Sequence, residues 1–302
     1  MKRFFIAIAM ICAALSASAQ TSRYEQRYDL LVSQFGPAGV GVETALNNWE
    51  KADSANAKML LGKFSYYYTK AQSSEVESRP SKRYLGMDPV LTLKDSLGNN
   101  VYYYNINVFD DQLYGEAMKV ADKAIALWPD KLDFRFMKAN AYIAYEKDSP
   151  DMALAFLKAL ADENDRRKSS WTYDNEKVDQ AFFREAMQEY CFSFYSIGSP
   201  SSYDAFYALS EKLSQLFPSD MQFVNNMGSY YLVAKKDYKT AYKYYNKVLK
   251  VEPDNASAIR NGVLAARNEK NAKQEKKYLQ SMIRYGSESE KLQAQARLDQ
   301  LK

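Results

Sequence analysis

The sequence contains no histidine, the side chain most often used for acid–base catalysis. That absence excludes Ser-His-Asp and Cys-His nucleophile arrangements and every metal site with a histidine ligand. The sequence also contains neither G-x-x-x-x-G-K-[ST] nor G-x-G-x-x-G, the glycine-rich motifs that bind phosphates. We therefore expect no cofactor and no resident metal.

Cysteine chemistry is similarly restricted. The chain has two cysteines, and Cys12 lies in an N-terminal apolar run that we expect to be removed. Cys191 is then left without a disulfide partner, and a zinc site of four thiolates is excluded. Cys191 lies among aromatic residues in EYCFSFY (189–195). A buried, inert thiol is the expected state, and a reactive thiol is the alternative.

The remaining candidates for catalysis are pairs of carboxylates. Asp110 and Asp111 stand at the predicted start of a helix, where an acidic side chain caps free N–H groups and suits the helix dipole. A glycosidase needs two opposed carboxylates in a cleft, and the sequence leaves open a pair built from distant residues. We expect a protein that is not an enzyme.

The elements that must position these side chains are helices. In residues 230–255, YYLVAKKDYKTAYKYYNKVLKVEPDN, the residues Ala241, Tyr245, Val248 and Pro253 lie at offsets 0, 4, 7 and 12. The first three share one helix face, and the proline ends the helix. A small residue lets a neighbouring helix approach closely, and an aromatic residue one turn later fills the adjoining space.

The preceding segment completes a recognisable unit. Met227-Gly228 is followed by Tyr231 three residues after the glycine, and Val224 stands three residues before Met227. The unit resembles a tetratricopeptide repeat, whose pattern is W-x2-L-G-x2-Y, then A-x3-F, then P. Ala117, Ala121, Ala124 and Pro129 repeat the second half of that pattern, with Leu61-Gly62 as the upstream partner.

The resemblance implies an all-α, right-handed helical solenoid of about five helix pairs with a small β-hairpin insertion. We expect capping helices within 20–53, the solenoid over 54–286, and a capping helix within 287–302. Further pairs are expected at 131–147 with 150–162, 176–197 with 202–217, and 255–269 with 271–284. Two interruptions are expected, an insertion at 73–110 and a loop at 164–175.

The insertion at 73–110 contains two short β-strand patterns, VLTL and NVYYY. It is either a structural flap over the helices or a partner-binding element. In the loop, NDRRKSSWTYDN, basic residues precede Trp171 and Tyr173. We expect a solvated loop whose tryptophan ring packs down, with anion or nucleic-acid binding as the alternative. Our overall expectation is that nucleic acid is not a partner.

The first residues, MKRFFIAIAMICAALSASAQ, have the form of a secretory signal peptide. Lys2 and Arg3 precede an apolar run, and Ala17-Ser18-Ala19 forms a cleavage site, so residues 1–19 are expected to be removed; an uncleaved anchor is the alternative. No other stretch is apolar enough to span a membrane. The periplasm is the expected location, with secretion as the alternative. The chain is similar to secreted tetratricopeptide-repeat proteins of Bacteroidetes-type bacteria.

The resemblance also implies where a partner binds, in a concave groove lined by the first helix of each pair. The positions three before and one after the small residue face outward in the family, and two further residues share those faces. These groove candidates are Asp133, Phe136, Asn140, Asn225, Ser229, Ile259, Val263 and Arg267. No Lys/Asn pair lies one turn apart among them, so the family's clamp for a peptide carboxylate is not expected.

The predicted function is a non-catalytic exported scaffold that binds a protein or peptide, with envelope assembly as one such role. The alternative is a glycan-binding component of a nutrient-capture system, which would use exposed tyrosines in the runs 66–68 and 102–104. Lys239, Lys243, Lys247 and Lys250 form a stripe opposite the small-aromatic face. That stripe is either the solvated side of a helix or a surface for an acidic partner or anionic lipid headgroup.

Overall fold

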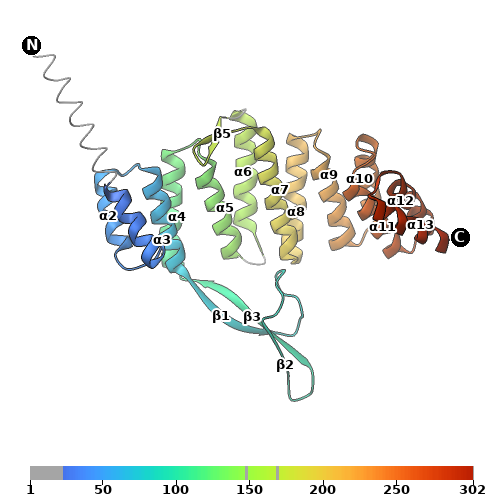
Figure 1. Cartoon of the computed structure of the whole chain (residues 1–302), viewed down its shortest axis with the longest axis horizontal. Coiled ribbons are helices and arrows are strands. Elements are labelled where there is room, and N and C mark those ends of the chain that lie inside the picture. Colours follow the sequence, from blue (N-terminus) through green and yellow to red (C-terminus); the bar gives the residue numbers. More distant parts are fainter. Residues whose placement is uncertain (1–22, 147–148, 168–169, 302) are drawn as a thin grey trace, which may run out of the picture. The chain divides into compact units, whose positions relative to one another are not determined.

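The computed structural model describes residues 23–146, 149–167 and 170–301. The expected signal peptide lies outside the described residues. The chain forms two compact units (Figure 1). Of the described residues, the first unit draws on 23–82, 88–145 and 170–178. The second unit draws on 83–87, 146, 149–167 and 179–301.

Helices form the body of the first unit. Residues 23–35 are helical, and they are followed by α2 (Val42–Ala52), α3 (Ala57–Ala71), α4 (Asp111–Leu127) and α5 (Leu132–Glu146). Side-chain caps fix where two of them begin, because Asn56 Oδ1 accepts a hydrogen bond from Met59 N at 3.1 Å and Asp110 Oδ1 accepts one from Leu113 N at 2.9 Å. The capping role predicted for Asp110 is confirmed.

The insertion between α3 and α4 is a three-stranded antiparallel sheet in the order β1-β3-β2. Its strands are β1 (Gln72–Arg79), β2 (Leu91–Lys94) and β3 (Asn100–Phe109). The predicted hairpin of β2 and β3 is confirmed. The strand β1 was not predicted, because its sequence QSSEVESR is polar and lacks alternating apolar residues. The connection between β1 and β2 packs against the sheet. Buried Tyr104 of β3 donates a hydrogen bond to Ser81 O of this connection at 2.7 Å.

A second small sheet stands where a loop was expected. It consists of β4 (Trp171–Tyr173) and β5 (Glu176–Val178), so the prediction of an irregular segment through 175, followed by a helix from 176, was wrong. Asp174 and Asn175 form the turn with positive φ angles of 49° and 64°, conformations that Asp and Asn tolerate better than most residues. The tryptophan ring packs down as predicted: Trp171 is 1% exposed, and the Arg135 guanidinium lies 4.8 Å from its centroid.

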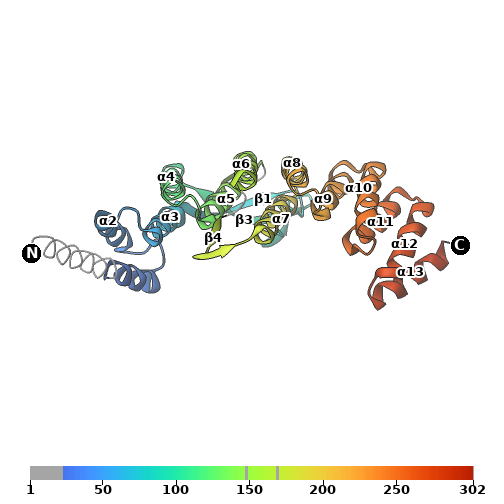
Figure 2. The ribbon, with the colours of Figure 1, turned by 90° about the horizontal axis from the view of Figure 1, so that it is seen from above.

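The second unit is built almost entirely of helices, and consecutive helices from α7 to α13 contact each other in chain order. Figure 2 shows α6 and α8 on one side of this unit and α7 and α9 on the other. The helices are α6 (Asp151–Arg167), α7 (Gln180–Ile197), α8 (Pro200–Leu216), α9 (Met221–Tyr230), α10 (Tyr238–Val251), α11 (Ala256–Glu269), α12 (Ala272–Tyr285) and α13 (Glu288–Gln300). One π-helical turn, Tyr231–Lys235, joins α9 to the bend before α10.

Small residues packed against aromatic rings hold successive helices of this unit together. A Cβ at Gly228 of α9 would lie 2.5 Å from Tyr245 Cε1 of α10, and a Cβ at Gly262 of α11 would meet the ring of Tyr278 of α12 still more closely. Ala241, Tyr245 and Val248 are fully buried. The spacing in residues 230–255 therefore serves helix packing, and the all-α class with its small sheet is confirmed. In the described parts of the chain, no helix has both the length and the apolar character needed to cross a membrane.

Candidate polar groove on α7, α9 and α11

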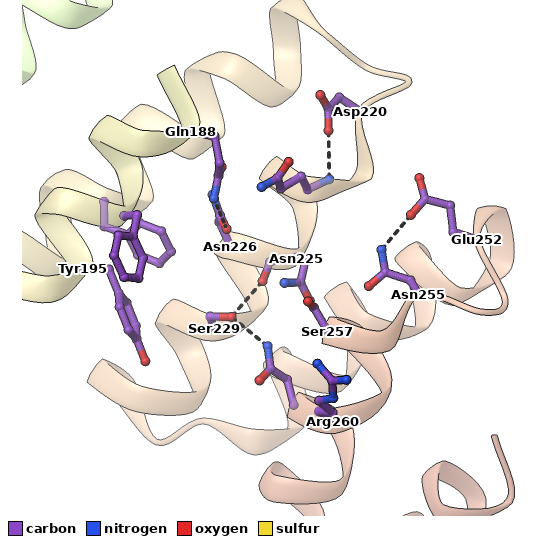
Figure 3. Close-up of a pocket in the computed structure, with 14 residues that line it drawn as sticks. Gln188, Tyr195, Asp220, Asn225, Asn226, Ser229, Glu252, Asn255, Ser257 and Arg260 are labelled. Carbon is purple, nitrogen blue, oxygen red and sulfur yellow. Dashed lines mark hydrogen bonds between the residues drawn. The ribbon is translucent and has the colours of Figure 1, made fainter. Parts of the chain in front are cut away.

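The second unit contains a pocket of about 640 Å³ on the side where α7, α9 and α11 lie (Figure 3). Amide and hydroxyl side chains dominate its lining, and aromatic rings stand on its α7 side. We call this pocket the polar groove. Its lining residues are Gln188, Phe192, Tyr195, Phe206, Asp220, Gln222, Asn225, Asn226, Ser229, Glu252, Asn255, Ser257, Arg260 and Asn261.

A reciprocal pair of amides joins α7 to α9 beneath the groove. Asn226 Nδ2 donates to Gln188 Oε1 at 2.7 Å, and Gln188 Nε2 donates to Asn226 Oδ1 at 3.3 Å. Asn226 Nδ2 also lies 3.3 Å from Ser210 Oγ of α8. Asn226 is only 6% exposed, so these bonds satisfy a buried amide and fix both side chains.

Asn225, the next residue, is placed differently. It is 8% exposed, and its Oδ1 atom has no hydrogen-bond partner among the described residues. Below it, Ser229 Oγ donates to Asn225 O at 3.1 Å and accepts a hydrogen bond from Asn261 Nδ2 of α11 at 3.2 Å. The groove therefore contains one amide oxygen that is buried without a hydrogen-bond partner among the described residues, beside neighbours that are already hydrogen-bonded.

The charged residues of the groove are engaged at its rim. Asp220 caps α9 by accepting from Gln222 N at 3.0 Å, and Glu252 Oε2 accepts from Asn255 Nδ2 at 2.7 Å. Arg260 Nε donates to Glu290 Oε1 at 2.6 Å. That bond, together with hydrogen bonds from Ser287, lowers the pKa of Glu290 to about 2. The centre of the groove thus presents uncharged polar groups.

Aromatic residues of α7 and α8 form the opposite wall. Phe192 is 59% exposed, which is unusual for a phenylalanine in a helix, whereas Phe206 is buried. The Tyr195 ring lies 5.3 Å from the Phe206 ring, and burial raises the pKa of its hydroxyl. The Tyr195 hydroxyl therefore stays protonated at neutral pH and can donate a hydrogen bond.

Two of the groove candidates predicted from the sequence, Asn225 and Ser229, line this groove. Ile259 and Val263 of α11 are instead buried, at 2% and 6% exposed, so their predicted outward placement was wrong. Arg267 lies apart from the groove and donates to buried Glu275 at 2.9 Å.

The three candidates on α5 belong to the first unit. The β4–β5 hairpin covers two of them, because the Tyr173 ring lies 5.9 Å from the Phe136 ring and Asp174 N donates to Asp133 Oδ1 at 3.0 Å. Asn140 is exposed on the same helix. Phe136 and Asp133 of α5 therefore hold the β4–β5 hairpin against this helix.

Sequence reasoning missed most of the groove. The residues of α7 were missed because that helix contains no glycine to fix the register of its outward face. The residues of α11 were missed because the positions three before and one after Gly262, which were expected to face outward, pack inward. A detectable signal existed, since Asn225-Asn226 and Arg260-Asn261 are polar pairs just before Gly228 and Gly262 within otherwise apolar stretches.

The tyrosine runs that carried the glycan alternative are not exposed. Tyr66 and Tyr104 are buried at 5% and 0% exposed, and the other four tyrosines are half-buried. Their rings pack on neighbours; Tyr68, for example, stacks on Phe64 at 5.3 Å. The run 66–68 therefore packs in the hydrophobic core of the first unit, whereas the run 102–104 lies in the sheet, where Tyr102 and Tyr103 are partly exposed.

The chain was also compared with known proteins. No protein-family model matches it, and no curated protein matches its sequence.

Proposed function

We propose that this protein is a non-catalytic binding scaffold of the tetratricopeptide-repeat type, exported from the cytoplasm, that holds an extended peptide segment of another protein in the polar groove. An extended peptide presents N–H and C=O groups along its backbone and side chains to either side. The amide side chains of α9 and α11 can form hydrogen bonds with the peptide backbone, and the exposed Phe192 ring can pack against an apolar side chain of the peptide. No charge at the centre of the groove demands a charged ligand.

The observation that carries the proposal is the buried Oδ1 atom of Asn225. A buried acceptor without a partner costs about 1–3 kcal/mol. A backbone N–H of a bound peptide would supply the missing bond once the Asn225 side chain turns its buried oxygen into the groove. The neighbouring amide network holds Asn226 and Ser229 in place, so the partner would meet a rigid surface with little side-chain ordering left to be done.

The repeat assignment rests on the packing of Gly228 on Tyr245 and of Gly262 on Tyr278, two helix pairs that use the same small-on-aromatic contact. Export rests on the sequence of residues 1–19. A role in envelope assembly follows from those two expectations together, because an exported binding scaffold meets other exported chains.

The test uses the full chain and a library of unconstrained displayed peptides. We expect selection of extended peptides with an apolar side chain. We expect Asn225→Ala and Phe192→Ala each to weaken the best peptide by roughly fivefold or more, since a buried group left without its hydrogen-bond partner costs about 1–3 kcal/mol and a lost aromatic contact costs about as much. Gln293→Ala, an exposed amide on α13, is the matched control and should change nothing.

A second measurement separates binding from folding. Asn225→Ala removes an unsatisfied buried acceptor, so the free energy of unfolding of the free protein should stay the same or rise. Peptides that bind equally well to the wild type, Asn225→Ala and Phe192→Ala would contradict the proposal. A library that yields no specific peptide would do the same.

A further inference from the structure

A separate feature of the second unit lies on α10 and α12, on residues that the polar groove does not use. In α10, four exposed lysines recur every three or four residues along one face, opposite the buried Ala241, Tyr245 and Val248. In α12, exposed cations recur at the same kind of spacing. We call these seven residues the basic face: Lys239, Lys243, Lys247, Lys250, Lys273, Lys277 and Arg284.

The two rows of cations lie side by side. Lys277 Nζ of α12 donates to Asn246 Oδ1 of α10 at 2.7 Å, and Tyr278 Oη lies 3.2 Å from the same atom. A pocket of about 650 Å³ separates the rows further along, and its lining includes Lys250, Lys277, Arg284 and Tyr285. The basic face is therefore one continuous surface across two helices.

Acidic side chains do not neutralise this surface. The helix α10 contains no Asp or Glu, and the one acidic residue of α12, Glu275, is buried and paired with Arg267 and Arg297. Within the described residues, none of the seven cations makes an ion pair. The nearest carboxylates in the sequence, Asp237 and Glu252, flank the lysine row at the two ends of α10, where they accept hydrogen bonds from Thr240 N and Asn255. Asp237 also attracts Lys243 electrostatically, which leaves the rest of the row uncompensated.

An ordinary solvated helix face mixes charges of both signs. The helix α8 in the same unit does so, with Asp204, Glu211 and Lys212, and its lysine pairs with Asp162 of α6. The exposed faces of α10 and α12 therefore carry only positive charges, and this feature is not shared by all helices of the unit.

The kind of cation points to the kind of partner. Six of the seven are lysines, whose ammonium is a compact, hydrated point charge without the planar fork that arginine uses for directional recognition. Lysine is depleted in protein–protein interfaces, whereas clusters of lysine near a bilayer are attracted to anionic headgroups irrespective of their exact geometry. Tyr285, which is 38% exposed, lines the pocket between the two rows, and tyrosine is enriched in the interfacial zone of bilayers.

We propose that the basic face docks the protein peripherally on a membrane surface rich in anionic lipid headgroups. The lysine stems lie along the helices and their ammonium groups reach the headgroup layer. Attachment is electrostatic and reversible, and it leaves the polar groove on α7, α9 and α11 free, so it does not depend on the proposed peptide binding.

The test is co-sedimentation of the full chain with vesicles of phosphatidylcholine mixed with phosphatidylglycerol, and with vesicles of phosphatidylcholine alone. We expect binding to the anionic vesicles only, weakening as salt is added because surface charges are screened. The variant Lys243→Gln/Lys247→Gln/Lys250→Gln/Lys277→Gln should lose at least roughly tenfold in its partition onto anionic vesicles. Glutamine keeps helix propensity, and an unchanged circular dichroism melt verifies the fold.

The matched control removes the same net charge from exposed lysines elsewhere, as Lys51→Gln/Lys82→Gln/Lys94→Gln/Lys177→Gln. It should bind anionic vesicles like the wild type. Equal losses in the two quadruple variants would overturn the proposal, because net charge alone would then explain the binding. Equal binding to phosphatidylcholine alone would overturn it too. Binding to soluble polyglutamate but not to vesicles would assign the basic face to an acidic polymer instead.

Discussion

Gly228 of α9 packs directly against the ring of Tyr245 of α10. A methyl group at Gly228 would lie 2.5 Å from Tyr245 Cε1 and 2.9 Å from Tyr245 Cδ1. Glycine costs helix stability because it has more freedom in the unfolded chain. Its presence in the last turn of α9, which continues into the π-helical turn, is therefore explained by the close approach of the two helices.

We expect Gly228→Ala to lower the free energy of unfolding by about 1–3 kcal/mol, because the added methyl group forces the ring of a fully buried tyrosine to move. Chemical denaturation followed by circular dichroism measures the change. Gly115→Ala in α4 is the matched control, since a Cβ there meets nothing within 4 Å. Gly115→Ala should stabilise by about 0.5–1 kcal/mol. A Gly228→Ala variant as stable as the wild type would contradict the packing described here.

Glu275 of α12 links three helices. It is 3% exposed; its Oε1 atom accepts from Arg297 Nε of α13 at 2.7 Å and from Arg267 Nε of α11 at 2.9 Å, and its Oε2 atom accepts from Arg297 Nη2 at 3.2 Å. The hydrogen bonds from Arg297 hold the pKa of Glu275 below its usual range. A carboxylate with a lowered pKa stabilises the fold above the unfolded pKa, and this contribution is lost as the pH falls through the folded pKa.

We therefore expect Glu275→Gln to lower the free energy of unfolding at neutral pH by about 1.5–3 kcal/mol, since it weakens charge-assisted bonds in a buried place. The difference from the wild type should begin to shrink as the pH falls below about 4.3, the pKa of a free glutamate, and should be lost as the pH falls through the lower pKa of the folded carboxyl. Glu288→Gln in α13, whose side chain is 88% exposed, should have almost no effect. A difference that is independent of pH would show that the charge of Glu275 does not matter.

The thiol of Cys191 is expected to be inert in the folded protein. The residue is fully buried, and burial raises the pKa of its thiol to about 12, whereas the thiolate is the reactive form. Ellman's reagent should label it only after denaturation, at which point the stoichiometry should reach one thiol in a chain that lacks residues 1–19. Rapid labelling of the native protein would contradict the buried placement and would restore the alternative of a reactive cysteine.

Helical periodicity made the helices predictable from the sequence, because each buries one stripe of residues. The regular small-aromatic spacing predicted α10, and Met227-Gly228 predicted its partner α9. The strands were harder to predict. The polar β1 pairs with β3 through backbone hydrogen bonds, which leave little trace in side-chain pattern. The sheet of β4 and β5 has three residues in each strand, too few to show alternation.

The polar groove could be predicted only where a glycine fixed the register. Asn225 and Ser229, the two positions selected from Gly228, line the groove. The same rule at Gly262 selected Ile259 and Val263, which are buried, because the face of a helix that meets solvent depends on how its neighbours pack around it. No sequence rule could have brought α7 to the groove, since its contribution depends on three helices meeting in space.

The reciprocal amide pair of Gln188 and Asn226 should behave as one energetic unit. Removing either side chain leaves a polar group of the other without its partner, and Asn226 is 6% exposed, so each single change to alanine should cost about 1–3 kcal/mol. The double variant Gln188→Ala/Asn226→Ala removes both partners together. It should therefore cost less than the sum of the single changes, with a coupling energy of about 0.5–3 kcal/mol.

The double-mutant cycle is measured by denaturant unfolding of the four proteins at one pH. Gln188→Ala combined with Gln293→Ala, two amides that share no hydrogen bond in the structure, is the control pair and should be additive. Additivity at Gln188 and Asn226 would mean that the pair contributes nothing jointly. If the coupling is found, a loss of peptide affinity in Asn226→Ala would follow from a loosened groove, whereas a loss in Asn225→Ala at unchanged stability would identify direct contact with the ligand.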